Sequence, residues 1–237
     1  MSNEIIFFGC WNNGGCDLDS TNPNSLTTTI KGLNDYLSNI EKKPKTLIVA
    51  GDNYYPKKNK KTKDDKTKND KPSKIFKQEE ISSGFDCLQE LDIEKKFILL
   101  GNHDLEKTIE GDNEEECNAT IYQKYLSDNN RNFNFFNFNS GTATEPRTLE
   151  IIRISNHTII IMFDSSIYEK KPEIYLECYN KLRSEETKFE SIDAIKQLQI
   201  IQRGNTIKEL NKIEYSKIKN IVFACHHPLF YFTPFLI

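Results

Sequence analysis

The sequence predicts an α/β fold, and two observations support that prediction. Short apolar runs rich in β-branched and aromatic residues recur along the chain, and longer segments of helical periodicity or polar composition separate them. Alternation of this kind is typical of sheets that are covered by helices. The chain has 237 residues, which is long enough for one large domain with a substantial buried core. We therefore expect a single domain over residues 1–237.

Five apolar runs predict the strands, and each is short enough to be a strand rather than a helix. They are Ile5–Phe8, Thr46–Ala50, Phe97–Leu100, Thr158–Phe163 and Ile221–Ala224. The segments between them predict amphipathic helices near Leu26–Ile40, Gly84–Leu91, Glu115–Leu126 and Ile192–Ile213. The last segment contains Gly204, so its pattern fits either one helix or two.

A lysine-rich segment interrupts this pattern between Lys57 and Lys74. It holds nine lysines and three aspartates, a balance of +6, which leaves −9 for the remainder of a chain whose net charge is −3. The segment has no apolar residue to bury, so we expect a mobile insertion at 57–74 in an otherwise acidic domain. The basic charge lies in this one stretch without interleaved aromatic residues, which disfavours nucleic acid as a partner.

The sequence also carries signals about the cellular setting. No stretch approaches the roughly 20 apolar residues that a membrane span needs, so we expect no membrane partner. The residues before Ile5 lack a basic segment, and the apolar run that follows is too short for a signal peptide. These features favour an intracellular protein, or one whose targeting signal lies outside this chain. Two glycosylation-type patterns, Asn118-Ala119-Thr120 and Asn156-His157-Thr158, are then expected to be coincidental.

The cysteines are scattered, without the close pairs of a zinc ribbon or the density of a small stapled domain. We therefore expect free thiols. The six are Cys10, Cys16, Cys87, Cys117, Cys178 and Cys225.

Each predicted strand is followed by a polar block. In open α/β sheets, functional groups gather beyond the carboxyl ends of the strands. Any one block could be a turn or a helix cap, but five in succession predict a shared site at one edge. The blocks are Gly9-Cys10-Trp11-Asn12, Gly51-Asp52-Asn53-Tyr54-Tyr55, Gly101-Asn102-His103-Asp104, Asp164-Ser165-Ser166 and Cys225-His226-His227-Pro228.

The order of these blocks resembles the calcineurin-like metallophosphoesterases, whose pattern runs D-x-H, G-D-x-x, G-N-H-[DE], H and G-H-x-H. The likeness spans residues 5–230. Within that family, the block from Gly51 to Tyr55 resembles the G-D-N-[FY]-Y block of purple acid phosphatases, and the block from His226 to Phe230 resembles their G-H-H-P-L-[YF]. The resemblance implies an αββα sandwich of two mixed sheets and the hydrolysis of a phosphorylated substrate, whose class it does not specify.

The resemblance also implies a role for each matching residue. Asp52 would bridge two divalent or mixed-valence metal ions, of iron, zinc or manganese. Tyr55 would bind the first ion, and Asn102 and His226 would bind the second. His103 would orient the phosphate and protonate the leaving group, while a metal-bound hydroxide attacks phosphorus.

Two departures from the family pattern bear on activity. Cys10 stands where a metal-binding aspartate is expected, and it is either a substituted metal ligand or a small buried residue at a strand end. The G-H-x-H block is absent, because no histidine follows His227. This absence predicts a domain that is incomplete at its C-terminal end, with each metal one histidine short. The alternative function is a non-catalytic or truncated module that keeps the fold for binding.

Overall fold

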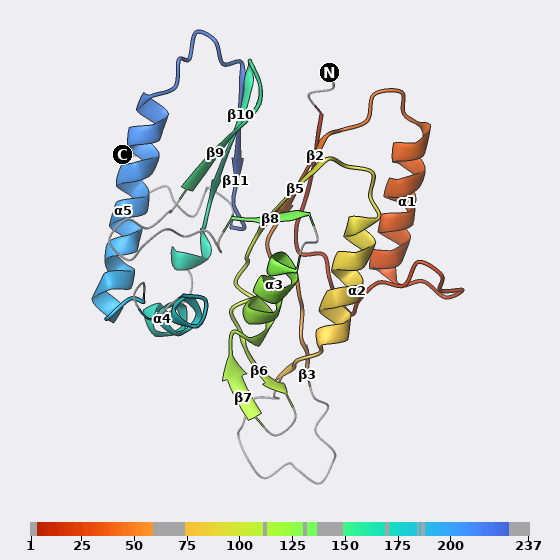
Figure 1. The fold of residues 1–237 in the computed structure, drawn as a ribbon, viewed down its shortest axis with the longest axis horizontal. Coiled ribbons are helices and arrows are strands. Elements are labelled where there is room, and N and C mark those ends of the chain that lie inside the picture. The colour runs from red at the N-terminus through yellow and green to blue at the C-terminus, as the bar shows by residue number, and fades with distance from the viewer. Residues whose placement is uncertain are drawn as a thin grey trace.

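The structure is a computed structural model, and it describes residues 4–58, 74–110, 113–129, 132–136, 149–168, 171–183, 185 and 188–227. Eleven strands and five α-helices make up this part of the chain (Figure 1). The strands are β1 (Ile5–Phe8), β2 (Thr46–Ala50), β3 (Lys57–Lys58), β4 (Lys74–Ile75), β5 (Lys95–Leu99), β6 (Lys107–Glu110), β7 (Asn113–Glu116), β8 (Phe133–Phe135), β9 (Leu149–Ser155), β10 (Thr158–Phe163) and β11 (Asn220–Ala224). The helices are α1 (Ser25–Asn39), α2 (Gln78–Gln89), α3 (Asn118–Asp128), α4 (Pro172–Lys181) and α5 (Ile192–Asn211), with a short 3₁₀ turn at Ser166–Tyr168.

The first sheet has the order β1-β2-β5-β8, and all of its pairs are parallel. Strand β2 is buried along its whole length, because parallel sheets are usually covered on both faces. This burial explains the continuous apolar run Thr46–Ala50, which has no polar alternation. Parallel pairing also places the carboxyl ends of β1, β2 and β5 at one edge.

The second sheet has the order β11-β10-β9, in which β10 is parallel to β11 and antiparallel to β9. Strand β10 is buried throughout. The two sheets pack face to face through one apolar cluster, where Ile48 and Leu99 of the first sheet meet Ile160 and Met162 of the second. This packing brings the carboxyl end of β11 close to those of β2 and β5.

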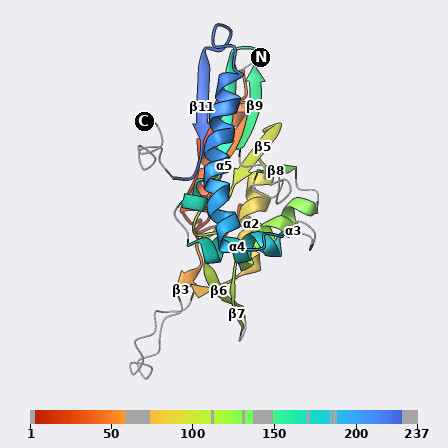
Figure 2. The ribbon, with the colours of Figure 1, turned by 90° about the vertical axis from the view of Figure 1, so that its left-hand side faces the viewer.

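Helices cover the outer face of each sheet. Apolar side chains of α1, α2 and α3 pack with those of the first sheet, whereas α4 and α5 lie on the side of the second sheet (Figures 1 and 2). Asn24 caps α1 by accepting a hydrogen bond from the backbone N–H of Thr27. The four layers therefore follow the order αββα, as predicted.

All five predicted strands and all four predicted helices are present, with boundaries that shift by a few residues. The first sheet is parallel rather than mixed, and a small third sheet of order β3-β4-β6-β7 was not predicted. The segment that contains Gly204 is one helix, α5. An added Cβ at Gly204 would meet nothing within 4 Å, so this glycine lies on an open face and does not break the helix.

The prediction of free thiols is wrong for four of the six cysteines. Cys16 is bonded to Cys87, which joins the loop after β1 to α2, and Cys117 is bonded to Cys178, which joins the start of α3 to α4. The partners are 71 and 61 residues apart in sequence, so cysteine spacing did not indicate the pairs. Cys10 is free.

The ends of the lysine-rich segment are ordered in strands. Lys58 pairs with Lys74 across the antiparallel strands β3 and β4. Residues 59–73 lie outside the described part of the chain, so the predicted mobile insertion stays a prediction.

In the residues that the structure describes, no helix combines the length and the apolar character that a membrane crossing requires. Residues 228–237, which include part of the last polar block, also lie outside it.

Candidate active site

The site begins with two tight backbone turns at the ends of β1 and β2. Cys10, Gly51 and Asp52 all have positive φ angles, of 54°, 83° and 51°, and the N–H of Cys10 donates to the carbonyl of Gly51 at 3.0 Å. A Cβ at Gly101 would lie 2.3 Å from the backbone nitrogen of Asp52. Glycine at position 101 is therefore required for the end of β5 to approach the end of β2.

Asp52 lies at the centre of the site and is 3% exposed. Its Oδ1 accepts a hydrogen bond from the N–H of His103 at 2.9 Å, and its Oδ2 accepts one from the hydroxyl of Tyr55 at 2.7 Å. The Sγ of Cys10 lies 3.7 Å from Oδ2, and the Nε2 of His226 lies 3.2 Å from Oδ1. Ligand atoms of Cys10, Asp52 and His226 all lie within 4.8 Å of one another.

The orientation of His226 is set by the first sheet. Its Nδ1 lies 2.8 Å from the carbonyl oxygen of Ala50, which can only accept a hydrogen bond, so Nδ1 carries a proton. Its Nε2 then faces the Oδ1 of Asn102 at 2.9 Å and the Oδ1 of Asp52. A histidine whose far nitrogen donates to a backbone carbonyl is the usual arrangement for a metal ligand. The geometry leaves Nε2 and two oxygen atoms facing one another across a space suited to a cation.

The pKa values of these side chains are shifted by burial and by their contacts with one another. Burial acts to raise the pKa of Asp52, but the imidazole of His226 and the donors from Tyr55 and His103 outweigh it and lower that pKa to about 2. The pKa of Tyr55 is raised by burial and by its contacts with Cys10 and Asp52. Burial also raises the pKa of the Cys10 thiol. A metal bound by Tyr55 and Cys10 would therefore have to displace their protons.

His103 lies beside Asp52 and Tyr55 and is held there by a contact with Glu106. Its Nδ1 lies 3.0 Å from Glu106 Oε2, and its ring centroid lies 4.7 Å from that of Tyr55. Lys74 forms an ion pair with the same oxygen of Glu106. The contact with Glu106 raises the pKa of His103 above its ordinary value. Neither Glu106 nor Lys74 was predicted to take part; the spacing of three residues between His103 and Glu106 is a sequence signal for Glu106 alone.

Residues 5–236 match the family model of the calcineurin-like phosphoesterases. The chain belongs to that family. Searches of curated proteins and of solved structures gave no match.

The structure brings together every side chain predicted for the phosphoesterase site, from the ends of four different strands. They are Cys10 after β1, Asp52 and Tyr55 after β2, Asn102 and His103 after β5, and His226 after β11. Cys10 is an exposed residue, so it is not the small buried strand-end residue considered as an alternative. The roles of these residues belong to the proposal below.

Asp104, the last residue of its polar block, has a structural role in the phosphoesterase. It is fully buried and accepts hydrogen bonds from the backbone N–H groups of Gly101 and Asn53 and from the side chain of Gln123, at 2.8, 3.0 and 2.9 Å. Burial raises its pKa to about 7 against these donors. Asp104 therefore ties the turn after β5 to the turn after β2 and to α3. Gln123 was missed, because nothing in a helical segment marks a glutamine that faces inward.

The block after β10 is also structural. The Oδ2 of Asp164 accepts hydrogen bonds from Tyr175 and Tyr179 of α4, and its Oδ1 accepts one from the N–H of Ser166. Next to it, the Oγ of Ser165 accepts a hydrogen bond from the N–H of His227 at 2.9 Å. The block therefore fixes α4 and the turn after β11, and Asp164 is not brought to Asp52 by any described contact.

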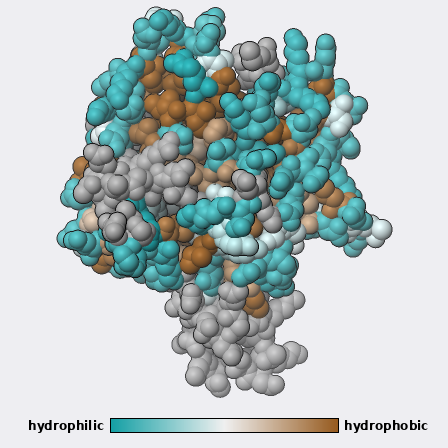
Figure 3. All heavy atoms as spheres, viewed as in Figure 1, coloured by the Kyte–Doolittle hydropathy of each residue, from teal (hydrophilic) through white to brown (hydrophobic). Residues whose placement is uncertain are grey.

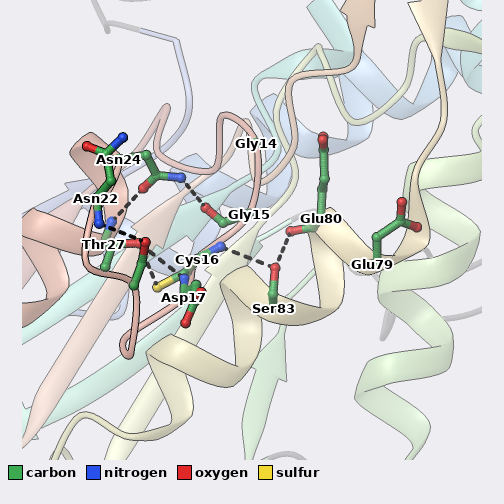
Figure 4. A pocket seen from close by; sticks show the side chains of 11 residues that line it. Gly14, Gly15, Cys16, Asp17, Asn22, Asn24, Thr27, Glu79, Glu80 and Ser83 are labelled. Carbon is green, nitrogen blue, oxygen red and sulfur yellow. Dashed lines mark hydrogen bonds between the residues drawn. The ribbon is translucent and has the colours of Figure 1, made fainter.

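A separate pocket of about 410 Å³ lies between the loop after β1 and the start of α2 (Figure 4). Asn24 and Thr27 are hydrogen bonded to each other and to the loop, and Ser83 bonds the N–H of Cys16. Glu80 lines the pocket, and its Oε1 pairs with Lys57 at 2.8 Å. These contacts hold the loop that carries the Cys16–Cys87 disulfide. The residues of the Asp52 site do not line this pocket.

Proposed function

We propose that this chain hydrolyses phosphate esters with the help of metal ions held around Asp52. The observation that supports the proposal best is the meeting of Asp52 Oδ1, Asn102 Oδ1 and His226 Nε2, at distances of 2.9 and 3.2 Å from the nitrogen. Three electron-pair donors at such distances repel one another unless a proton or a cation lies between them. Carboxylate, amide and imidazole groups are common ligands of manganese, iron and zinc.

The residues fit such ions, and each has a place in the proposed ligand set. Asp52 has two oxygens directed at different neighbours, Tyr55 and Cys10 on one side and His226 on the other. In the proposal, Cys10 and Tyr55 bind a first ion, Asn102 and His226 bind a second, and Asp52 serves both. Tyr55 is the residue that favours a purple acid phosphatase type of centre with iron, since a phenolate is a good ligand for that metal.

Bound metal ions would supply charge neutralisation for the phosphate and a more acidic water. The contribution of the protein is to position the substrate and to move a proton. His103 is the proposed general acid, because its contact with Glu106 raises its pKa and so favours the protonated imidazole that a proton donor needs. Its position beside Tyr55 places it next to the proposed ligands without making it one of them.

The proposed ligand set is one histidine short at each ion, because the chain has no G-H-x-H block. Removal of groups that merely orient ligands already costs about 10–100-fold in affinity or activity, so the absence of a direct ligand costs more. We therefore expect weak metal binding and turnover of an activated aryl phosphate below about 1 s⁻¹, under the ordinary enzyme range.

The test is steady-state hydrolysis of 4-nitrophenyl phosphate and of its bis-ester by residues 1–237, with manganese, zinc or iron added. Metal content is measured on the same samples by elemental analysis. We expect slow, metal-dependent turnover that is lost in Asp52→Ala together with bound metal. Turnover that is equal in Asp52→Ala would overturn the proposed site, and metal binding without turnover would favour the non-catalytic module.

A further inference from the structure

The chain contains two Asn-x-Thr patterns, at Asn118 and at Asn156, and the structure places them in opposite surroundings. Asn118 is the first residue of α3 and is 8% exposed. Thr120 of the same pattern is fully buried, and its hydroxyl donates to the backbone carbonyl of Asp104 at 2.7 Å. A glycan on Asn118 would have to enter the interior beside the Asp104 network.

Asn156 lies in the tight turn between β9 and β10 and is exposed, as is its neighbour His157. This turn lies at the top of the molecule, at the free end of the second sheet (Figure 1). A hairpin tip directs its side chains into solvent, so a large hydrophilic group attached there requires no repacking of the core. The folded structure therefore accommodates a glycan on Asn156 and excludes one on Asn118.

The two disulfides supply an independent observation about the compartment. Bonds such as Cys16–Cys87 and Cys117–Cys178 form and persist where the surroundings oxidise thiols, as in the secretory pathway, and they are rare in the cytosol. The secretory pathway is also where Asn-x-Ser/Thr patterns are glycosylated. The pairing of four cysteines thus places the Asn156 pattern in the setting where it is chemically competent.

We infer that Asn156 is an N-glycan acceptor of the folded protein and that a chain with a glycan on Asn118 does not reach the native fold. In the transfer, the Nδ2 of Asn156 forms a bond to the anomeric carbon of an oligosaccharide carried on a lipid diphosphate. The bond between that carbon and the diphosphate oxygen breaks, the lipid diphosphate leaves with the electron pair, and Nδ2 gives up one proton. No oxidant or reductant is consumed.

The hydrogen bonds around the turn in the folded chain indicate that the glycan is transferred to Asn156 before the chain folds. Thr158, whose hydroxyl the transferase must recognise, is 4% exposed in the folded chain, and its Oγ1 accepts from the side chain of Asn220 at 3.2 Å. The carbonyl of His157 accepts from the N–H groups of Lys219 and Asn220. Asn220 lies 62 residues beyond Thr158. Transfer must therefore precede the pairing of β10 with β11, while the chain is being synthesised.

The position of the glycan is compatible with the proposed phosphatase site. Strand β10 runs from the turn at Asn156 towards Asp164 at the opposite end of the sheet. Six residues of strand span about 20 Å at 3.3 Å per residue. The glycan therefore lies at the far end of the sheet from the carboxyl-end edge, and its presence is independent of whether the chain hydrolyses phosphate esters.

The test is expression of the full chain behind a secretion signal in a eukaryotic cell. An amidase that releases N-glycans is applied in heavy-oxygen water, which converts an occupied asparagine to a labelled aspartate. Peptide mass analysis is made on secreted and cell-retained protein alike, so a folding defect cannot hide the modification. In the secreted protein we expect labelled aspartate at position 156 with unmodified Asn118, and an electrophoretic shift of one glycan that disappears in Asn156→Gln.

Two further variants sharpen the result. Thr158→Ser keeps the acceptor pattern and should retain the glycan, whereas Thr158→Val removes it at nearly constant volume and should lose the glycan. A chain with no label at position 156, or with label only at position 118, would overturn the inference. So would a secreted chain whose four cysteines titrate as free thiols, because the compartment argument would then fail.

Discussion

Asp52 and Asp164 are both buried aspartates close to the carboxyl end of a strand. The comparison between them shows how a functional site differs from a structural cluster. Each directly follows or closely follows a buried strand, and each is almost fully buried, at 3% and 6% exposure. The described hydrogen bonds to Asp164 come from two tyrosine hydroxyls and one backbone N–H, so its charge is matched by donors. Asp52 also accepts hydrogen bonds from one backbone N–H and one tyrosine hydroxyl, but in addition it faces Cys10 and His226, which are potential metal ligands. The further ligand atoms around the carboxylate, rather than burial or strand position, mark the functional aspartate.

The largest expected effect comes from Asp52→Asn, which keeps the shape of the side chain but removes its charge. Metal affinity and hydrolysis should fall by more than about 100-fold, because the loss of a direct ligand exceeds the effect of an outer partner. The melting temperature should fall as well, because the substitution removes a charge that His226 and the donors from Tyr55 and His103 stabilise. Elemental analysis and steady-state kinetics measure the first effect, and calorimetry measures the second. A large loss of stability with metal binding intact would reverse the roles assigned to the two aspartates.

The matched variant Asp164→Asn should lower the stability without lowering metal affinity or hydrolysis. The amide offers one oxygen for the two tyrosine hydroxyls and brings an N–H₂ group against other donors, so we expect a loss of about 2 kcal/mol in the free energy of unfolding. Activity per folded molecule should stay within about threefold. Chemical denaturation followed by tryptophan fluorescence measures the stability. If Asp164→Asn abolished hydrolysis in folded protein, the second sheet would contribute to the site directly.

A smaller and spectroscopic effect is expected from the tyrosines. In protein loaded with iron, Tyr55 should give a visible tyrosinate-to-iron charge-transfer band that Tyr55→Phe abolishes. Tyr175→Phe should keep the band and cost about 1 kcal/mol of stability, the usual contribution of one hydrogen bond. Absorption spectra of the two variants separate these roles. A colourless protein with iron bound would show that the centre is not of the purple acid phosphatase type.

The smallest effect concerns the lysine-rich segment. Replacing residues 59–73 by a two-residue turn that joins Lys58 to Lys74 should leave the melting temperature within a few degrees, because closing a long loop costs little more than closing a short one. Lys57 and Lys74 are kept, since they pair with Glu80 and Glu106. A melting temperature lowered by more than about 10 °C, several kcal/mol in a domain of this size, would show that the segment packs on the domain.

Much of the fold could be predicted from the local sequence, because strands that are buried along their whole length are continuous apolar runs. Thr46–Ala50 and Thr158–Phe163 are buried along their whole length, so their continuous apolar runs could not be mistaken for half-buried strands. Strand β9, with the sequence LEIIRIS, was missed because its residues are only partly buried and carry Glu150 and Arg153 among the apolar ones. Helix α4 was missed for the same reason, since it mixes buried and exposed positions within ten residues.

The candidate site was predictable where its residues follow strands, and not where they come from elsewhere. Asp52, Asn102 and His226 each follow a strand; parallel pairing brings the first two together, and the packing of the two sheets adds His226. Glu106, Gln123 and the two disulfides depend on how loops and α3 pack, which no local pattern records. The distinction between Asp52 and Asp164 likewise depends on Tyr175 and Tyr179, which lie 11 and 15 residues after Asp164.

The left-handed backbone at Cys10 and Asp52 has an evolutionary consequence. Residues other than glycine in this conformation cost about 1 kcal/mol or more each. Glycine at position 10 would relieve that cost and leave the turn intact, whereas glycine at position 52 would also remove the acceptor for Tyr55 and His103. A library selected for thermal stability alone should therefore drift towards glycine at position 10, whereas selection that also demands metal-dependent turnover should retain the cysteine. The turn after β1 is where stability and catalysis compete for the same residue.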